Sequence, residues 1–159
     1  MALEIERKFL LASDSWRDEA AGGTCLKQGY LSGNAENAVV RVRIAGEKAF
    51  LTIKGRASGI ARQEFEYEIP CADAEALLSL CSGFIVEKVR YTIPAENGMI
   101  WEIDDYCGVN AGLTTAEIEL PSAETEFIHP EWLGSDISND YRYSNSALSE
   151  NPFSQWDDR

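Results

Sequence analysis

The fold is decided by a stretch near the start of the chain, residues 3–11, which reads LEIERKFLL. Charged residues alternate there with mostly apolar ones, which predicts a β-strand with Glu4, Glu6 and Lys8 on one face. Neighbouring positions on that face lie about 7 Å apart, so both carboxylates can reach one divalent cation, with the ammonium one step further along. Such a face suits a metal-bound anionic ligand. The other strands are therefore interpreted by asking which of them complete this face.

Seven further stretches alternate in a similar way, so we expect about eight strands. The further strands are expected at residues 24–31, 38–44, 48–55, 62–69, 84–93, 99–106 and 114–120. Tight turns at 45–47 and 95–98 and a polar loop at 32–37 would connect some of them. Helices are expected at 13–20, ended by Gly22 and Gly23, and at 72–81, around 122–127 and over 139–148.

Length and composition indicate a single globular domain. The chain has 159 residues, of which 45% are hydrophobic and 26% charged. We expect one domain over residues 1–148 and a polar, acidic tail over 149–159. The net charge of -13 argues against an exterior that binds nucleic acid or an anionic membrane, although a basic pocket can lie inside an acidic protein.

Cysteine and histidine usage argues against a structural zinc site. The four cysteines are irregularly spaced without a CxxC motif, and the only histidine, His129, precedes a proline. We interpret the cysteines as thiols in a reducing compartment. The charged N-terminal residues are unlike a signal peptide, and no apolar run is long enough to span a membrane. We therefore expect a cytoplasmic protein with no membrane partner.

The charged faces of the strands admit two architectures. One is a sandwich or half-open sheet whose charged faces contact water, the usual outcome for a β-rich chain. The other is a closed antiparallel barrel with its polar side inward, which for eight strands leaves room for one small ligand. Like charges recur on one face, as in Arg41 with Arg43 and Glu117 with Glu119, and such neighbours repel. This distribution favours a lumen for a concentrated anion, but periodicity alone does not choose between the two.

The order of short charged motifs along the chain also carries a family resemblance. The motifs are Glu4-x-Glu6-x-Lys8, Arg41-x-Arg43, Thr52-x-Lys54, Glu64-x-Glu66, Lys88-x-Arg90, Glu102-x-Asp104, Glu117-x-Glu119 and Arg142-Tyr143-Ser144-Asn145. In this order they resemble the CYTH superfamily, the triphosphate tunnel metalloenzymes, and the compact chain is most similar to the small bacterial inorganic triphosphatases. The resemblance implies an α+β, mainly β fold: an eight-stranded antiparallel closed β-barrel, or tunnel, with a charged lumen and a few flanking helices.

The resemblance also implies an enzyme that hydrolyses a triphosphate with Mg²⁺ or Mn²⁺. The substrate expected first is inorganic tripolyphosphate, giving pyrophosphate and orthophosphate. An adenylyl cyclase, a thiamine triphosphatase and a non-catalytic polyphosphate- or nucleotide-binding module stay open as alternatives. No basic or aromatic patch specifies RNA, so the expected partner is a small-molecule triphosphate. A homodimer is compatible with the sequence.

Residue roles follow from phosphate and metal chemistry within this resemblance. The substrate-binding residues would be Lys8, Arg41, Arg43, Lys54, Arg56, Lys88 and Arg90. The metal ligands would be Glu4 and Glu6, meeting Glu117 and Glu119 across the lumen. Catalytic roles are assigned to Lys8, Lys54 and Tyr30. Supporting roles are assigned to Arg62, Glu64, Glu66, Glu102, Asp104 and Arg142. Structural alternatives are a core position for Tyr30 and a barrel-end cap for Arg142.

Overall fold

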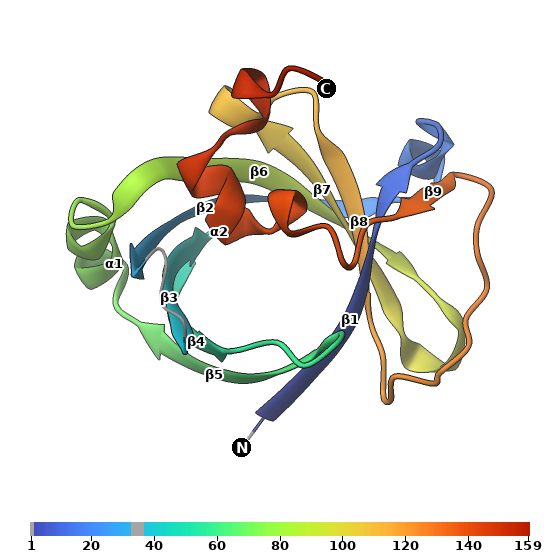
Figure 1. Cartoon of the computed structure of the whole chain (residues 1–159), viewed down its shortest axis with the longest axis horizontal. Helices are drawn as coiled ribbons and strands as arrows, with labels where there is room; N and C mark the ends of the chain where they lie inside the picture. The colour runs from blue at the N-terminus through green and yellow to red at the C-terminus, as the bar shows by residue number, and fades with distance from the viewer. Residues whose placement is uncertain (1, 33–36) are drawn as a thin grey trace.

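The computed structural model describes residues 2–32 and 37–159 and shows a closed antiparallel β-barrel (Figure 1). Within these residues, eight strands form the barrel: β1 (Ala2–Leu11), β2 (Ala21–Ser32), β3 (Ala38–Ala45), β4 (Lys48–Gly55), β5 (Ala61–Ile69), β6 (Ser82–Pro94), β7 (Ile100–Cys107) and β8 (Thr114–Glu119). The loop expected at 32–37 falls mainly on residues 33–36, outside the described part. The closed ring confirms the barrel and excludes the half-open sheet.

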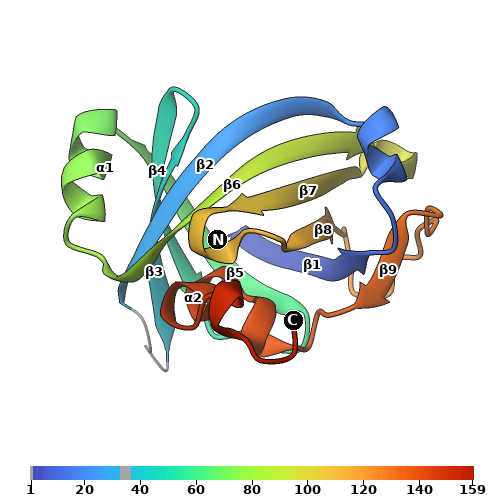
Figure 2. The same cartoon turned by 90° about the horizontal axis from the view of Figure 1, so that it is seen from above.

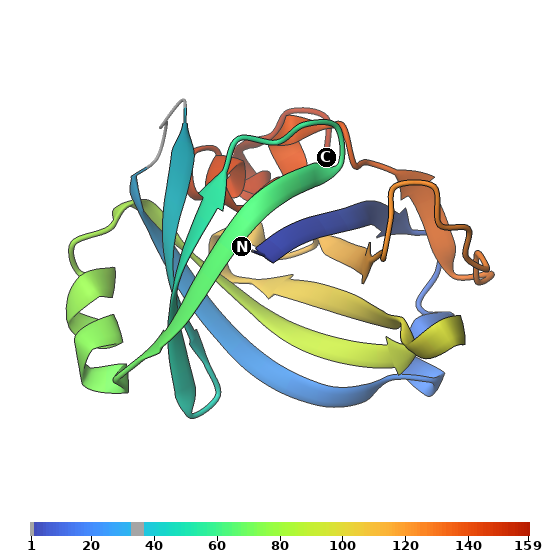
Figure 3. The ribbon, with the colours of Figure 1, turned by 90° about the horizontal axis from the view of Figure 1, so that it is seen from below.

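Strand β1 closes the ring because its two ends pair with different neighbours. Residues 2–5 pair with β5, whereas residues 6–10 pair with β8. The order around the barrel is β1-β5-β4-β3-β2-β6-β7-β8, with β2 and β6 as long, curved neighbours (Figures 2 and 3). A short extra strand, β9 (Leu133–Asp136), pairs with the last residues of β1 outside the ring. Strands β3 and β8 therefore lie opposite each other, since they are four steps apart in either direction.

Helices occupy little of the chain and lie at the margins of the barrel. Helix α1 (Cys71–Leu78) covers β3 and β4 from outside, and α2 (Asn145–Glu150) packs against β6 and β2 (Figure 2). Short 3₁₀ turns lie at Ser15–Asp18, Glu96–Gly98, Gly108–Asn110, Tyr141–Tyr143 and Phe153–Gln155. No helix among the described residues has the length and apolar character needed to cross a membrane.

Several local predictions differ from the structure. The helix expected over 139–148 is a 3₁₀ turn at Tyr141–Tyr143 followed by α2, which begins only at Asn145. The segment 122–127 is not helical, and the Ser122 and Thr125 hydroxyls hydrogen-bond each other across a turn instead. Gly22 and Gly23 lie inside β2, with φ of 95° and 103°, at the bulge where β2 shifts its pairing with β6. Only glycine adopts such angles readily, so the pair bends a strand and does not end a helix. Strand β9 was not predicted, because its sequence LGSD has no strand-like alternation.

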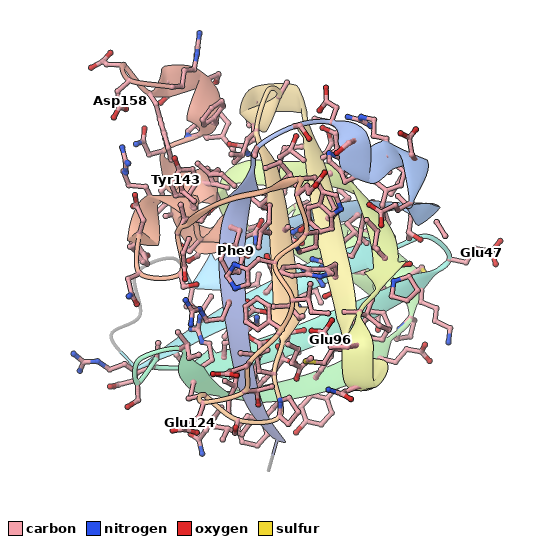
Figure 4. All side chains as sticks on the ribbon, turned by 90° about the vertical axis from the view of Figure 1, so that its right-hand side faces the viewer. Phe9, Glu47, Glu96, Glu124, Tyr143 and Asp158 are labelled. Atoms are coloured by element: carbon pink, nitrogen blue, oxygen red, sulfur yellow. The ribbon has the colours of Figure 1, made fainter. Side chains whose placement is uncertain are left out.

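The main hydrophobic core lies outside the barrel. The outer faces of β1, β7 and β8 carry Phe9, Trp101 and Ile118, which cluster with the buried Trp16 and Trp132. Phe9 meets the Trp101 ring edge-on at 5.8 Å between centroids and lies on the face of β1 that is viewed in Figure 4. Truncating a buried tryptophan or phenylalanine to alanine typically costs about 3–5 kcal/mol. This outer layer therefore lets the barrel keep its polar faces inward.

A smaller apolar cluster extends into the predicted tail. Val86 and Tyr106, on the lumen side of their strands, pack with Leu148 of α2 and with Trp156. Trp156 is 8% exposed, and its indole nitrogen donates to the carbonyl oxygen of Asn151 at 3.0 Å. Part of segment 149–159 is therefore packed against the barrel. The domain boundary at residue 148 stays a prediction.

Candidate active site

The lumen of the barrel contains a polar cavity of about 200 Å³. Twelve of the described residues line it, and eleven of these are among the site residues predicted from the sequence: Glu4, Glu6, Arg41, Arg43, Lys54, Glu64, Glu66, Arg90, Glu102, Glu117 and Glu119. The twelfth is Asn145. The cavity shares Glu4, Glu6 and Lys54 with a larger one of about 560 Å³ at one mouth, which is also lined by Lys8, Arg56 and Arg62. At its other side it shares Arg43, Glu66 and Arg90 with a third of about 290 Å³.

The register of the strands explains how a chain with so many like-charged pairs can form a closed barrel. Charges repeat along each strand, but opposite charges often face each other across neighbouring strands. Lys54 is the partner of Glu64 and contacts it at 3.3 Å, and Lys8 is the partner of Glu117, also at 3.3 Å. Lys54 also lies 3.0 Å from Glu4. These cross-strand ion pairs offset the repulsion along each strand.

Asp104 holds two predicted phosphate-binding residues in place. Its carboxylate contacts Lys88 at 2.8 Å and Arg90 at 2.7 Å. Burial opposes the ionisation of Asp104, yet Lys88 and Arg90 lower the pKa of this carboxyl far below its ordinary value. Lys88 is only 1% exposed and is not among the described residues that line the cavity. Asp104 therefore supports the cations, as its assigned role implies, and Lys88 lies one layer behind the surface of the lumen.

Strand β3 presents two arginines whose charge is poorly compensated. Arg41 donates to the Thr52 hydroxyl at 3.2 Å and reaches the half-exposed Glu66 only at 3.5 Å. Arg43 donates to the neutral amide oxygen of Gln28 at 2.8 Å, and it makes no ion pair within the described residues. Burial, together with Arg41 and Arg90, lowers the pKa of Arg43 to about 10. This wall of the lumen has an excess of positive charge that an anion would relieve.

Strands β7, β8 and β1 form a wall with the opposite excess. Glu6 faces Glu119 across β1 and β8, and Glu102 faces Glu117 across β7 and β8. Directly opposed like charges destabilise a sheet. Burial, followed by Glu117 and Glu4, raises the pKa of Glu6 well above its ordinary value, despite the nearby lysines. Glu4 and Glu6 therefore lie beside Glu117 and Glu119 on one wall, not across the lumen from them as predicted, because β1 and β8 are adjacent strands.

This carboxylate wall has the right chemistry for a hard divalent cation. In the described part of the chain, no three acidic, cysteine or histidine side chains already surround one point. Glu4 is held by Lys54, and Lys8 lowers the pKa of Glu117 to about 2 although burial opposes this shift. Glu6 and Glu119 make no ion pair with any described residue. Because Mg²⁺ usually takes one or two carboxylates and completes its shell with water and substrate phosphate, this pair fits the ion.

The three predicted catalytic residues occupy different environments. Lys8 Nζ lies near Glu117 and donates to the carbonyl oxygen of Tyr143 at 3.2 Å. Lys54 lines the cavity between Glu4 and Glu64. Tyr30 is 4% exposed, and its hydroxyl accepts a hydrogen bond from Gln28 at 3.0 Å. The geometry of Tyr30 therefore matches the core alternative, with Gln28 linking it to Arg43.

Three predicted arginines lie away from the central cavity. Arg56 and Arg62 are at the larger mouth, where the Arg62 guanidinium donates to the Gly55 carbonyl oxygen at 2.9 Å. Arg142 pairs on the surface with Asp140 at 3.0 Å and Asp158 at 3.3 Å, which matches the structural alternative. Sequence reasoning included Thr52 in a motif without giving it a role, and it missed Tyr106 as a polar neighbour of the site. Both share a strand face with predicted residues, so the alternation rule could have identified them.

Comparison with known proteins places this barrel in a family. The family model described as the CYTH domain matches residues 2–149. An inorganic triphosphatase from Acetivibrio thermocellus is 42% identical over 154 residues, which covers 96% of this chain and 97% of that protein. An inorganic triphosphatase from Nitrosomonas europaea is 36% identical over 148 residues, covering 92% and 96%. The crystal structure of the inorganic triphosphatase NE1496 shares 34% identity and a TM-score of 0.65, covering 94% of this chain and 95% of that one. The chain belongs to the CYTH domain family.

Proposed function

We propose that this chain hydrolyses inorganic tripolyphosphate to pyrophosphate and orthophosphate with the help of Mg²⁺ or Mn²⁺. The observation that carries the proposal is the pairing of two opposite walls in one cavity. On β3, Arg41 has only a long contact with Glu66 and Arg43 has no ion pair among the described residues, while Glu6 and Glu119 on the far wall have none either. A metal-bound polyphosphate complements both walls at once. Two relatives that match nearly the full chain are inorganic triphosphatases, which supports this substrate.

The cations of the lumen would bind and orient the substrate. Arginine pairs with phosphate oxygens through two parallel N–H donors, so Arg41, Arg43 and Arg90 suit a linear chain of phosphates. Arg90 is held from behind by Asp104 through two hydrogen bonds, at 2.7 and 2.9 Å, which fixes its position before the ligand arrives. Preorganised charge of this kind is the main means by which proteins accelerate phosphoryl transfer.

The carboxylate wall would hold the metal. Glu6 and Glu119 would be its first ligands, with Glu4 and Glu117 available if they exchange their lysine contacts for the ion. When bound, such an ion neutralises phosphate charge and lowers the pKa of a water that can attack phosphorus. Glu117 raises the pKa of Lys8, outweighing burial, so this lysine keeps its proton at neutral pH. Lys8 would therefore stabilise developing negative charge on phosphate and would not act as a base. Lys54, which lines the cavity between Glu4 and Glu64, would add a second contact to the phosphates.

Product analysis tests the proposal. The purified chain is incubated with tripolyphosphate, ATP and thiamine triphosphate, each with Mg²⁺, with Mn²⁺ and with excess EDTA. We expect equal amounts of orthophosphate and pyrophosphate from tripolyphosphate with a metal, and no turnover with EDTA. Cyclic nucleotide from ATP would favour a cyclase, preferential cleavage of thiamine triphosphate would change the substrate, and binding without any product would favour a non-catalytic module. Turnover that persists in EDTA would exclude the metal. Cytoplasmic location and a homodimer stay predictions.

A further inference from the structure

Among the described residues that line the central cavity, Asn145, the first residue of α2, is the one to which the sequence prediction assigned no role. Its side-chain oxygen accepts two hydrogen bonds, from Lys88 Nζ at 3.2 Å and from the Tyr106 hydroxyl at 2.9 Å. Both donors are nearly inaccessible to solvent, with Lys88 1% and Tyr106 4% exposed. The orientation of this amide is therefore fixed from behind.

The chemistry of the donors determines which end of the amide faces the ligand. A lysine ammonium has three N–H donors and no acceptor, so it can only bond the oxygen of the amide. The nitrogen, with two N–H donors, is left on the other side. That nitrogen makes no hydrogen bond within the described part of the chain. Asn145 thus offers the lumen a neutral donor whose direction is set by Lys88 and Tyr106.

The backbone around Asn145 is held as firmly as its side chain. The Ser144 hydroxyl accepts from the Ala147 amide at 3.2 Å and caps α2. The Tyr143 carbonyl oxygen accepts from Lys8 at 3.2 Å. The short segment 143–145 therefore contacts two lumen lysines, Lys8 on β1 and Lys88 on β6, and brings α2 to a fixed position over the cavity.

We propose that Asn145 is a substrate-binding residue whose amide nitrogen donates to a non-bridging phosphate oxygen of the triphosphate. The inference rests on the proposed function of the same cavity. A neutral donor suits this position because Arg43 and Arg90 already lie close to Lys88. Lys88 and Arg90 already share the single carboxylate of Asp104, at 2.8 and 2.7 Å. A further cation would add repulsion, whereas an amide adds a hydrogen bond without charge.

Kinetics of Asn145→Ala and Asn145→Asp test the proposal against a purely structural role. Asn145→Ala loses the donor, and Asn145→Asp keeps an acceptor for Lys88 and Tyr106 but presents negative charge to the phosphate. We expect KM for tripolyphosphate to rise about ten- to a hundredfold in Asn145→Ala and further in Asn145→Asp, with smaller changes in kcat. Asn151→Ala and Asn151→Asp, at the exposed end of the same helix, are the matched controls and should keep the wild-type KM. A wild-type KM in Asn145→Ala, or an equal rise in the Asn151 variants, would overturn the proposal.

A measurement on the wild-type protein covers the case in which a variant fails to fold. The side-chain amide resonances of Asn145 are followed by NMR while tripolyphosphate is added in EDTA, so that no turnover occurs. We expect them to shift downfield on binding, as amide protons do when they donate to phosphate. Resonances that stay unmoved at saturation would overturn the proposal. If the wild type hydrolyses tripolyphosphate and only the Asn145 results are negative, this inference alone fails. If the wild type hydrolyses nothing, the proposed function fails.

Discussion

The wall of the lumen formed by β3 and the wall formed by β8 and β1 face each other and carry an excess of charge of opposite sign. On β3, Arg43 is half-buried near Arg41 and Arg90 and donates to the neutral amide of Gln28. On β8 and β1, Glu119 and Glu6 are direct strand partners without a lysine or arginine in contact, among the described residues. Between these walls, Lys54, Lys88 and Arg90 are each paired with carboxylates. Charge is therefore balanced on the intermediate strands and unbalanced on the two opposed walls.

The difference shows where stability has been given up for binding. A carboxylate pair such as Glu6 and Glu119 would be stabilised by one lysine between them, as Glu117 is by Lys8. The chain instead leaves each wall with an excess that only an added ion relieves. An added cation and an added polyanion, bound together, satisfy both walls. The following predictions alter one wall at a time, beginning with the change of largest expected effect.

Removing a carboxylate from the β8–β1 wall should have the largest effect on turnover. In Glu6→Gln, the proposed metal loses a charged ligand, and we expect kcat for tripolyphosphate to fall by at least about a hundredfold, or ~2.7 kcal/mol. Higher Mg²⁺ should restore part of the rate. The control is Glu47→Gln in the exposed β3–β4 turn, visible at the edge of Figure 4. A Glu6→Gln enzyme with wild-type kcat at ordinary Mg²⁺ would remove Glu6 from the metal site.

Removing an arginine from the β3 wall should weaken the binding of tripolyphosphate. Arg43→Ala deletes a half-buried guanidinium that forms no ion pair with a described carboxylate, so the ligand loses a charge-assisted contact of roughly 1.5–3 kcal/mol. We expect KM to rise about ten- to a hundredfold, and Arg43→Lys to recover only part of the loss, since an ammonium cannot bond two oxygens in parallel. Arg17→Ala, which breaks a surface pair with Asp105, is the control. An equal KM in both variants would show that Arg43 does not touch the substrate.

The sequence predicted the strands well because alternation is a local property, whereas the closed barrel was predicted by the family resemblance that the order of the charged motifs carries. Strand β4 was predicted with the observed bounds, and the predicted bounds of β1, β3 and β8 differ from the observed ones by a single residue at one end. Charged residues at every second position could be recognised without any long-range contact. Like charges on one strand favoured a lumen for an anion over a solvated face. The structure adds that neighbouring strands supply opposite charges, as Glu64 does for Lys54.

The missed features depend on contacts between distant parts of the chain. The arrangement of Glu6 beside Glu119 depends on which strands close the ring, and alternation does not contain strand order. Asn145 enters the cavity only because α2 packs on β6, more than fifty residues away. Trp156 in the predicted tail is buried in a cluster with Val86 and Tyr106, which lie far from it in the sequence. Burial of Lys88 likewise follows from its neighbours and not from its motif.

Neutralising Glu119 should change stability less than turnover, and in the opposite direction. Burial, then Glu4 and Glu102, raises the pKa of Glu119, so the metal-free fold favours its protonated form. A carboxyl whose pKa is raised in the folded state opposes folding once it is ionised. As the pH rises from below the ordinary glutamate pKa of about 4.5 through the raised pKa of Glu119, the stability of the wild type should therefore fall relative to that of Glu119→Gln. At neutral pH in EDTA, Glu119→Gln should melt at the same temperature as wild type or slightly above it.

The same melts test the metal. Ligand at a hundred times its dissociation constant stabilises by about 2.7 kcal/mol, which a melting curve resolves. We expect Mg²⁺ with tripolyphosphate to raise the wild-type melting temperature clearly and that of Glu119→Gln much less. If Mg²⁺ and tripolyphosphate do not change the wild-type melting temperature, binding in the lumen is contradicted. If Glu119→Gln melts well below wild type in EDTA, the excess of negative charge on the wall of β8 and β1 is contradicted.

Arg142 offers the smallest expected effect, because it belongs to neither wall. Its guanidinium pairs with Asp140 and Asp158 on the surface and lies 4.8 Å from the Trp156 ring, so it fastens the last residues of the chain to the segment before α2. Figure 4 shows Tyr143 and Asp158 together on this side of the molecule. Exposed ion pairs contribute little to stability. When Arg142 is removed, the Trp156 ring keeps its contact with the Tyr143 ring. Arg142→Ala should therefore lower the melting temperature only slightly and leave KM and kcat for tripolyphosphate unchanged, whereas a tenfold rise in KM would place Arg142 at the substrate and extend the cationic wall beyond β3.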